Sequence, residues 1–163
     1  MGDRLKGRVA IVTGAGGGIG RGEALALASQ GANVVINDVG AAVDGSGTGD
    51  ATPAERVVQE IKAMGSQAVA NHDNIVETET GEKLVKLALD NWGRLDIVIN
   101  NAGILRDRMI FNMAAEEFDA VIAVHLKGHF NLMRHACTYF RQARQPESAR
   151  RIRVGRLPLD MLQ

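Results

Sequence analysis

A glycine-rich stretch near the start of the chain, residues 9–20, constrains the fold more than any other segment. Its sequence is VAIVTGAGGGIG, in which an apolar run, Val9–Val12, is followed by closely spaced glycines. The pattern predicts a buried strand, a tight turn and then a helix. Gly14, Gly18 and Gly20 have three reasons to lack side chains: a tight turn, close approach of a phosphate, and close packing of helix on strand. The start of the helix favours a dinucleotide pyrophosphate, although a plain structural turn fits the glycine pattern about equally well.

Length and composition predict one soluble globular domain. The chain has 163 residues, of which 45% are hydrophobic and 23% charged, and its formal net charge is zero. A neutral chain argues against a nucleic-acid-binding protein, which would carry a basic excess. No apolar run approaches the roughly 20 residues that span a bilayer, so no membrane segment is expected.

The chain has one cysteine, Cys137, which limits the disulfides and metal sites that it can form. A single cysteine excludes an internal disulfide and a cysteine-rich metal cluster, and we expect no metal site. Cys137 falls in an apolar helical pattern, which predicts a core residue. The N-terminus, residues 1–8, is polar and has no secretory pattern, so we expect a reducing, cytoplasmic compartment.

Strands and helices are predicted to alternate along the chain. The expected strands after the first are residues 33–37, 67–70 and 95–99, and the expected helices are residues 19–30, 52–64, 82–92 and about 115–144. Thr52, Pro53 and Glu55 form a helix-start signal, with Thr52 as the cap. Residues 39–51 are rich in glycine and predict a surface loop that is either mobile or a lid.

This alternation predicts an α/β fold, a Rossmann-type doubly wound parallel sheet with strand order 3-2-1-4 and at most a partial fifth strand. Ligands of such sheets bind beyond the carboxyl ends of the strands. Four residues with suitable chemistry, Gly14, Asp38, Asp73 and Asn101, each follow a predicted strand. Their common position strengthens the prediction of a dinucleotide site.

Asp38 fits either a turn residue that ends the second strand or, as its position favours, a residue that selects the dinucleotide. A carboxylate at the end of the second strand can accept hydrogen bonds from both hydroxyls of an adenosine ribose, and it would repel a 2′-phosphate. No lysine or arginine follows nearby, so the residue pattern favours NAD over NADP. Asp73 could accept a hydrogen bond from the adenine amino group, but a simple turn residue fits that position nearly as well.

Two motifs, residues 13–20 (TGAGGGIG) and residues 100–103 (NNAG), resemble those of the short-chain dehydrogenase/reductase family in order and spacing. Residues 39–51, 104–108 and 124–128 are further similar to the (3R)-hydroxyacyl-CoA dehydrogenase part of peroxisomal multifunctional enzymes and its bacterial relatives. The resemblance covers residues 5–145 and implies an NAD-dependent oxidoreductase of secondary alcohols and ketones. It also implies a dimer or tetramer, and an acyl-CoA type of substrate in full-length relatives.

The resemblance implies a role for each cofactor-binding position. The pyrophosphate would lie at the glycine turn, the adenosine ribose at Asp38, the adenine at the end of the third strand, and the nicotinamide-side ribose after the fourth. The implied contacts, in that order, are Gly14, Gly18, Ile19 and Gly20; Asp38; Asp73 and Asn74; and Asn101, Ala102 and Gly103. Asn100 and Asn101 fit equally well as structural residues that tie the central strands together.

The catalytic residues that the resemblance implies are absent from these 163 residues. The family uses a serine, and a tyrosine with a lysine four residues later that lowers the tyrosine pKa. The one tyrosine, Tyr139, has Ala143 at that position and is better explained by packing. His125 occupies the place of an asparagine in the family's proton relay, so it is either a relay variant or a residue on the helix face. No catalytic residue is therefore assigned.

The end of the chain differs in composition from the rest. Residues 141–163 contain six arginines and only two acidic residues, whereas the preceding residues carry an acidic excess. We expect residues 1–145 to form a truncated NAD-binding domain and residues 146–163 an atypical arginine-rich tail. A change of coding frame after Gln145 and a naturally short relative with a basic arm both explain this tail.

Two functions follow from the sequence. The first is NAD-dependent oxidation of a secondary alcohol of the 3-hydroxyacyl type, by resemblance, with this chain binding cofactor without turnover. The second is a non-catalytic nucleotide-binding module or assembly partner. In both cases the fourth strand, residues 95–99, is expected near an uncovered edge, which predicts marginal stability and self-association.

Overall fold

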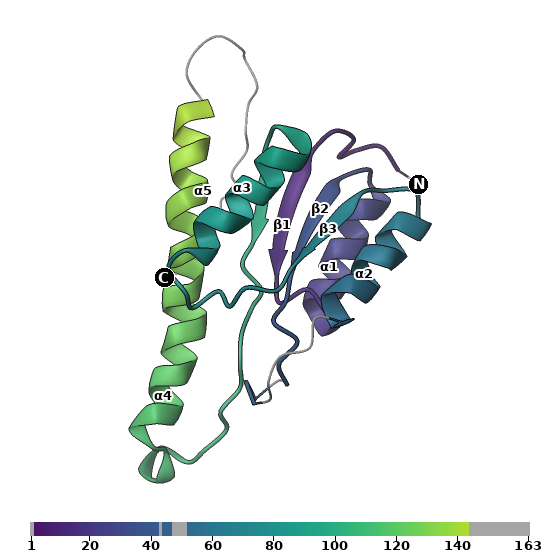
Figure 1. Ribbon diagram of the computed structural model, residues 1–163. Coiled ribbons are helices and arrows are strands. Elements are labelled where there is room, and N and C mark those ends of the chain that lie inside the picture. The colour runs from purple at the N-terminus through teal and green to yellow at the C-terminus, as the bar shows by residue number, and fades with distance from the viewer. Residues whose placement is uncertain (1, 43, 47–51, 144–163) are drawn as a thin grey trace, which may run out of the picture.

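A sheet of four parallel strands forms the centre of the computed structural model, which describes residues 2–42, 44–46 and 52–143 (Figure 1). The sheet has the order β3-β2-β1-β4, so the predicted Rossmann-type fold and its strand order are confirmed. The strands, in chain order, are β1 (Val9–Thr13), β2 (Asn33–Asn37), β3 (Ala68–Asn71) and β4 (Ile97–Ile99).

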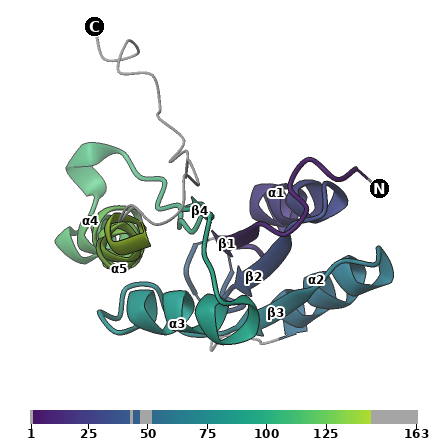
Figure 2. The ribbon, with the colours of Figure 1, turned by 90° about the horizontal axis from the view of Figure 1, so that it is seen from above.

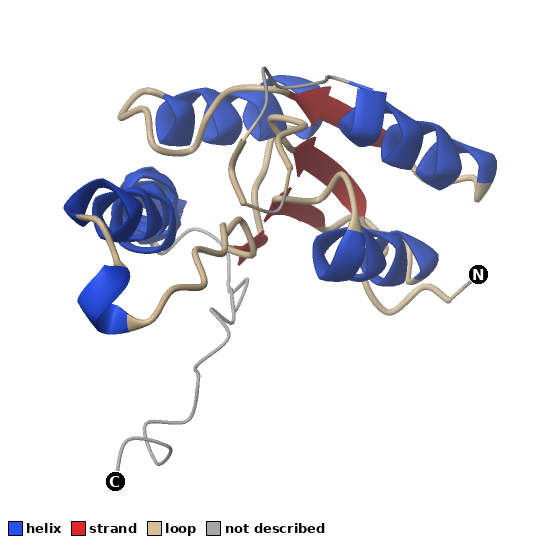
Figure 3. Ribbon diagram, turned by 90° about the horizontal axis from the view of Figure 1, so that it is seen from below, coloured by secondary structure: helices blue, strands red, loops and turns tan. Residues whose placement is uncertain are grey.

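Helices cover both faces of this sheet. Viewed from above, α1 (Gly18–Ser29) and α2 (Thr52–Ala63) lie on one side of the strands, and α3 (Thr80–Trp92) and α5 (His129–Ala143) on the other (Figure 2). The view from below shows the same layers, with strands between helices (Figure 3). The helix predicted from residue 52 is α2, whose first residue is Thr52. The role of Thr52 as the cap stays a prediction.

Alternating side chains of the strands build one apolar core on each face. In β1, Ala10 and Val12 belong to the core under α1 and α2, whereas Val9 and Ile11 belong to the core under α3 and α5. Every residue of β1 is buried. This two-sided burial explains why the strand is a continuous apolar run, as is typical of parallel sheets covered on both faces.

The fourth strand is shorter than the predicted residues 95–99. Asp96 still meets β1, because its backbone N–H donates to the Val9 carbonyl at 2.9 Å, and the Val9 N–H donates to Asp96 Oδ2 at 3.0 Å. The carboxylate thus takes the place of one backbone acceptor, and the regular ladder between β1 and β4 covers only Ile97–Ile99. Within the described residues, β4 has a neighbouring strand on one side only.

The predicted long helix consists of three consecutive segments. They are α4 (Ala115–Ile122), a π-helical turn (Ala123–Gly128) and α5, and a 3-10 turn (Ile110–Asn112) precedes them. Cys137 is exposed on α5, so the prediction of a core cysteine is wrong. Five large apolar residues of the predicted long helix are also exposed, namely Phe118, Ile122, Leu126, Phe130 and Met133.

A close contact between α3 and α5 fixes the second helical layer. A Cβ atom at Gly81 would lie 2.2 Å from the backbone oxygen of Asn131, so only glycine fits there. The buried Asn131 side chain donates from Nδ2 to the carbonyls of Ile75 and Val76, both at 3.0 Å. No helix among the described residues is long and apolar enough to cross a bilayer.

Candidate functional site

A cavity of about 660 Å³ lies at the carboxyl ends of the strands. It is lined by the loops that follow all four strands, together with Pro53 of α2 and Val124 of the π-helical turn. The loop residues that line it are Gly14, Gly16–Ile19, Asn37–Ala42, Gly45, Asn74, Ile75 and Asn101–Ile104. The cavity therefore occupies the position where doubly wound sheets bind their ligands.

The glycines of the first loop are needed for close backbone approach. Gly14 has φ of +62°, and a Cβ there would lie 2.8 Å from Ala102 Cα. A Cβ at Gly20 would lie 2.3 Å from the Gly14 carbonyl oxygen, so this glycine lets α1 pack against the turn. Gly18, the first residue of α1, has φ of +51° and open space where a Cβ would be. A phosphate can approach the start of α1 through this open side.

Asp38 lies at the end of β2 and is bound to the glycine turn. Its Oδ2 accepts the Gly16 N–H at 2.8 Å, and its Oδ1 accepts the Gly40 N–H at 2.7 Å. A carboxylate has about four acceptor positions, so each oxygen retains one for a ligand. Asp38 lines the cavity, and no lysine or arginine is among the described residues that do so.

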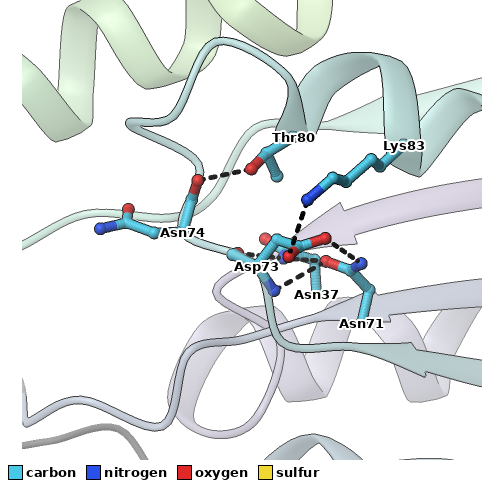
Figure 4. A network of polar contacts seen from close by, with 6 residues as sticks. All are labelled: Asn37, Asn71, Asp73, Asn74, Thr80 and Lys83. Carbon is cyan, nitrogen blue, oxygen red and sulfur yellow. Dashed lines mark hydrogen bonds and ion pairs between the residues drawn. The ribbon is translucent and has the colours of Figure 1, made fainter.

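Asp73 and Asn74, predicted at the adenine, differ in their surroundings. Asn74 lines the cavity and Asp73 does not. Asp73 Oδ2 accepts from Asn71 Nδ2 at 2.9 Å, and its Oδ1 lies 3.3 Å from Lys83 Nζ (Figure 4). The hydrogen bond from Asn71, helped by Lys83, holds the pKa of the Asp73 carboxyl below its ordinary value. Both carboxylate oxygens are thus already engaged within the protein.

A polar network that the sequence analysis missed joins the ends of β2 and β3. Asn37 is buried, and its Nδ2 donates to Asn71 Oδ1 at 2.8 Å and to the Asp73 carbonyl at 2.9 Å (Figure 4). Asn37 and Asn71 are direct partners in the parallel register. Both are asparagines that end apolar strands, and this shared position was the available signal for their contact.

Asn101 ties β1 to the loop after β4. Its Nδ2 donates to the carbonyls of Thr13 and Gly14, both at 3.0 Å. Thr13 Oγ1 in turn accepts the N–H groups of Asn101 at 3.2 Å and Ala102 at 3.1 Å. Asn101 therefore has the structural role that the sequence left open, while it and the two residues after it also line the cavity. Thr13 was not singled out from the sequence.

His125 touches the same loop from the π-helical turn. Its Nε2 lies 2.9 Å from the Ile104 carbonyl oxygen and 3.1 Å from the Ile104 nitrogen. A Cβ at Gly103 would meet the His125 ring at 2.6 Å. The His125 side chain thus contacts the backbone of the loop that follows β4. Its role in a proton relay stays a prediction.

Tyr139 lies on α5, where its ring packs edge-on against Phe140 at a centroid distance of 6.0 Å. It is half-buried beside the core under α3 and α5 and does not line the cavity. The arginine-rich tail, residues 146–163, lies outside the described residues. Among the side chains that are described, no group of three His, Cys, Asp or Glu residues could hold a metal ion.

A family profile described as short chain dehydrogenase matches residues 8–149. The chain belongs to this family. The resemblance that its two glycine-containing motifs indicated is therefore confirmed. The cavity lies where doubly wound sheets bind their ligands, among the loops at the carboxyl ends of the strands.

Three similar proteins support the assignment of the chain to this family. The chain is 50% identical over 139 residues to peroxisomal multifunctional enzyme type 2 of Mus musculus, covering 85% of this chain and 18% of that protein. It is 52% identical over 141 residues to the hydroxyacyl-CoA dehydrogenase ChsB1 of Mycobacterium tuberculosis, covering 84% of this chain and 41% of that one. A crystal structure of a short chain dehydrogenase from Mycobacterium avium matches with a TM-score of 0.77 and 55% identity, over 85% of this chain and 47% of that one. The chain thus spans less than half the length of these three relatives.

Proposed function

We propose that this chain binds NAD as the cofactor-binding part of an oxidoreductase that acts on secondary alcohols of the 3-hydroxyacyl type. The observation that carries the proposal is the Asp38 carboxylate, which lies on the cavity wall among residues that include no lysine or arginine. Such a site accepts ribose hydroxyls and disfavours a 2′-phosphate. One of the relatives is named as a hydroxyacyl-CoA dehydrogenase, which supports a substrate of the 3-hydroxyacyl type.

The proposed contacts divide the cofactor along the cavity. The pyrophosphate would lie at Gly14, Gly18 and Ile19, the adenosine ribose at Asp38, the adenine at Asn74, and the nicotinamide-side ribose at Asn101, Ala102 and Gly103. Gly20 and Asp73 do not line the cavity and would act by shaping the turn and the end of β3. The open side of Gly18 and the acceptor positions left on Asp38 fit this group. NAD, when bound, would supply the hydride acceptor for alcohol oxidation.

Calorimetric titration with NAD and NADP tests the proposal. We expect NAD to bind at least about tenfold more tightly than NADP, because the 2′-phosphate would face the Asp38 charge. Asp38→Ala should weaken NAD binding and reduce the preference to about threefold or less. Asp44→Ala is the matched control, because Asp44 lies in the same loop but its carboxylate does not line the cavity. Absence of NAD binding at millimolar concentration would overturn the proposal.

A second candidate is a non-catalytic nucleotide-binding module or assembly partner. It is favoured by Tyr139, which packs against Phe140 on α5 and has no lysine four residues later. A tyrosine without that lysine is a poor base at neutral pH. Formation of NADH from a 3-hydroxyacyl thioester would favour the first function over the second. We expect these 163 residues to form none, a result that fits the second function and also a cofactor-binding part without turnover.

The partners and the compartment belong to the same proposal. We expect the chain to form homo-oligomers or to self-associate through the exposed apolar side chains of α4 and α5. We propose a cytoplasmic location from the single cysteine. The mouse relative is named as peroxisomal, so microscopy of the tagged protein, scored for diffuse or punctate signal, is the test.

A further inference from the structure

His129, the first residue of α5, holds a backbone carbonyl of the cavity wall. Its Nε2 lies 2.9 Å from the carbonyl oxygen of Ala102. A carbonyl can only accept, so Nε2 carries the hydrogen of this bond. The ring is half-buried and lies one helical turn after His125, with 6.2 Å between the two ring centroids.

Ala102 is thereby held from two opposite sides. Its N–H donates to Thr13 Oγ1 at 3.1 Å, at the end of β1, while its carbonyl accepts from His129 on α5. The peptide bond between Ala102 and Gly103 is trans. In a trans peptide the N–H points opposite to the C=O, so the Gly103 N–H is directed away from His129.

Gly103 is exposed and lines the cavity. Its backbone N–H makes no hydrogen bond to any residue within 2–42, 44–46 and 52–143. The His125 ring packs where a Cβ of residue 103 would be and covers that side of the glycine. The N–H is thus a donor of fixed direction on the cavity wall.

We propose that His129 is a positioning residue for the cofactor. It fixes the Ala102–Gly103 peptide so that the Gly103 N–H donates to an oxygen of the nicotinamide riboside half of the dinucleotide. The inference rests on the proposed function, because it requires that NAD occupies this cavity. It assigns the adenine half no contact that depends on His129.

Two variants of His129 separate this role from packing. His129→Phe keeps a ring but removes the donor, whereas the Nε2 of glutamine in His129→Gln lies close to the position of the histidine Nε2. We expect His129→Phe to weaken NAD binding about five- to tenfold, the size of one hydrogen bond, because the Gly103 N–H would no longer be fixed toward the ligand. Binding of AMP, which represents the adenine half, should change less than about twofold, and His129→Gln should restore NAD binding. His135→Phe, on the same helix, is the control and should bind both ligands as the unchanged chain does.

Calorimetry with NAD and AMP gives these values, and the amide NMR signal of Gly103 reports the peptide itself. The Gly103 signal should shift in His129→Phe and return toward its original position in His129→Gln, with or without ligand. Equal weakening of NAD and AMP, unchanged NAD binding, or failure of glutamine to restore it would overturn the inference. If the unchanged chain binds AMP but not NAD, the inference and the proposed function both fail. Binding of NAD that ignores His129 removes the inference alone.

Discussion

Asp96 illustrates how one side chain holds two distant segments together. Its Oδ1 accepts from Arg8 Nη1 at 2.9 Å, and its Oδ2 accepts from Arg94 Nε at 2.7 Å and from the Val9 N–H at 3.0 Å. Burial alone would raise the pKa of this carboxyl, but the hydrogen bonds from Arg94, Val9 and Arg8 outweigh it and hold the pKa below its ordinary value. The charged form is therefore the one that stabilises the fold.

Replacing that charge should cost stability in a pH-dependent way. We expect Asp96→Asn to lower the free energy of unfolding by about 3 kcal/mol at neutral pH, because two arginines lose a buried partner. Since the folded pKa lies below the unfolded one, the contribution of Asp96 is complete above the unfolded pKa and is lost as the pH falls through the folded pKa. In urea unfolding followed by circular dichroism, the gap between the two proteins should therefore narrow as the pH falls below about 4, the ordinary pKa of an aspartate.

Asp90→Asn is the control for this measurement. Asp90 pairs with Lys86 one helical turn earlier on the exposed surface of α3. Such pairs contribute only a few tenths of a kcal/mol, so this variant should unfold close to the unchanged chain. A gap for Asp96→Asn that stays constant over the acidic range would contradict the assignment of the charge.

Among the elements, α3 and α5 pack closely at Gly81 and Asn131. We expect Gly81→Ala to destabilise the fold by about 1–3 kcal/mol, because its Cβ would lie 2.2 Å from the Asn131 oxygen and force the helices apart. Gly22→Ala in α1 is the matched variant, since nothing lies within 4 Å of its added Cβ. It should stabilise by about 0.5–1 kcal/mol. Thermal or urea unfolding measures both, and equal effects would refute the contact.

The accuracy of the sequence analysis varied from element to element for physical reasons. The strands β1 and β2 were predicted within one residue, because burial on both faces gives each a continuous apolar run. The start of β4 was misplaced because the Asp96 carboxylate, and not a backbone carbonyl, accepts the Val9 N–H. The pattern of apolar residues in the sequence does not show such a replacement. Cys137 was misassigned because its apolar pattern does not show whether another element covers the helix face.

The site divides in the same way. Gly14 and Asp38 could be placed at the cavity from the sequence because each directly follows a strand, and Gly18 because it belongs to the same glycine-rich turn. Thr13 and His129 could not, since each acts through hydrogen bonds to backbone groups far away in the chain. Such bonds depend on how the loop after β4 meets β1 and α5, and neither residue's spacing in the sequence reflects that arrangement.

For the molecule as a whole, exposed apolar side chains on its last helical segments predict self-association. Leu126, Phe130 and Met133 are exposed along the π-helical turn and α5. We expect the chain to self-associate at micromolar concentration and to unfold at a low, concentration-dependent temperature. Phe130→Glu combined with Met133→Lys should shift the sedimentation coefficient toward that of a monomer.

Met64→Glu serves as the control for sedimentation, because Met64 is also partly exposed but follows α2, away from α5. It should leave the association unchanged. A reversible, high-temperature unfolding transition of a monomer would contradict the expectation for the unchanged chain.

The short strand β4 has a consequence for local unfolding of the sheet. Ile97–Ile99 pair with β1 alone among the described residues, whereas β2 lies between β1 and β3. Deuterium should therefore enter the backbone of Ile97–Ile99 sooner than that of Val34–Ile36, because a strand bonded along one border opens without disturbing the rest of the sheet. Local opening of β4 would then reach the residues beside Asn101, at the wall of the cavity.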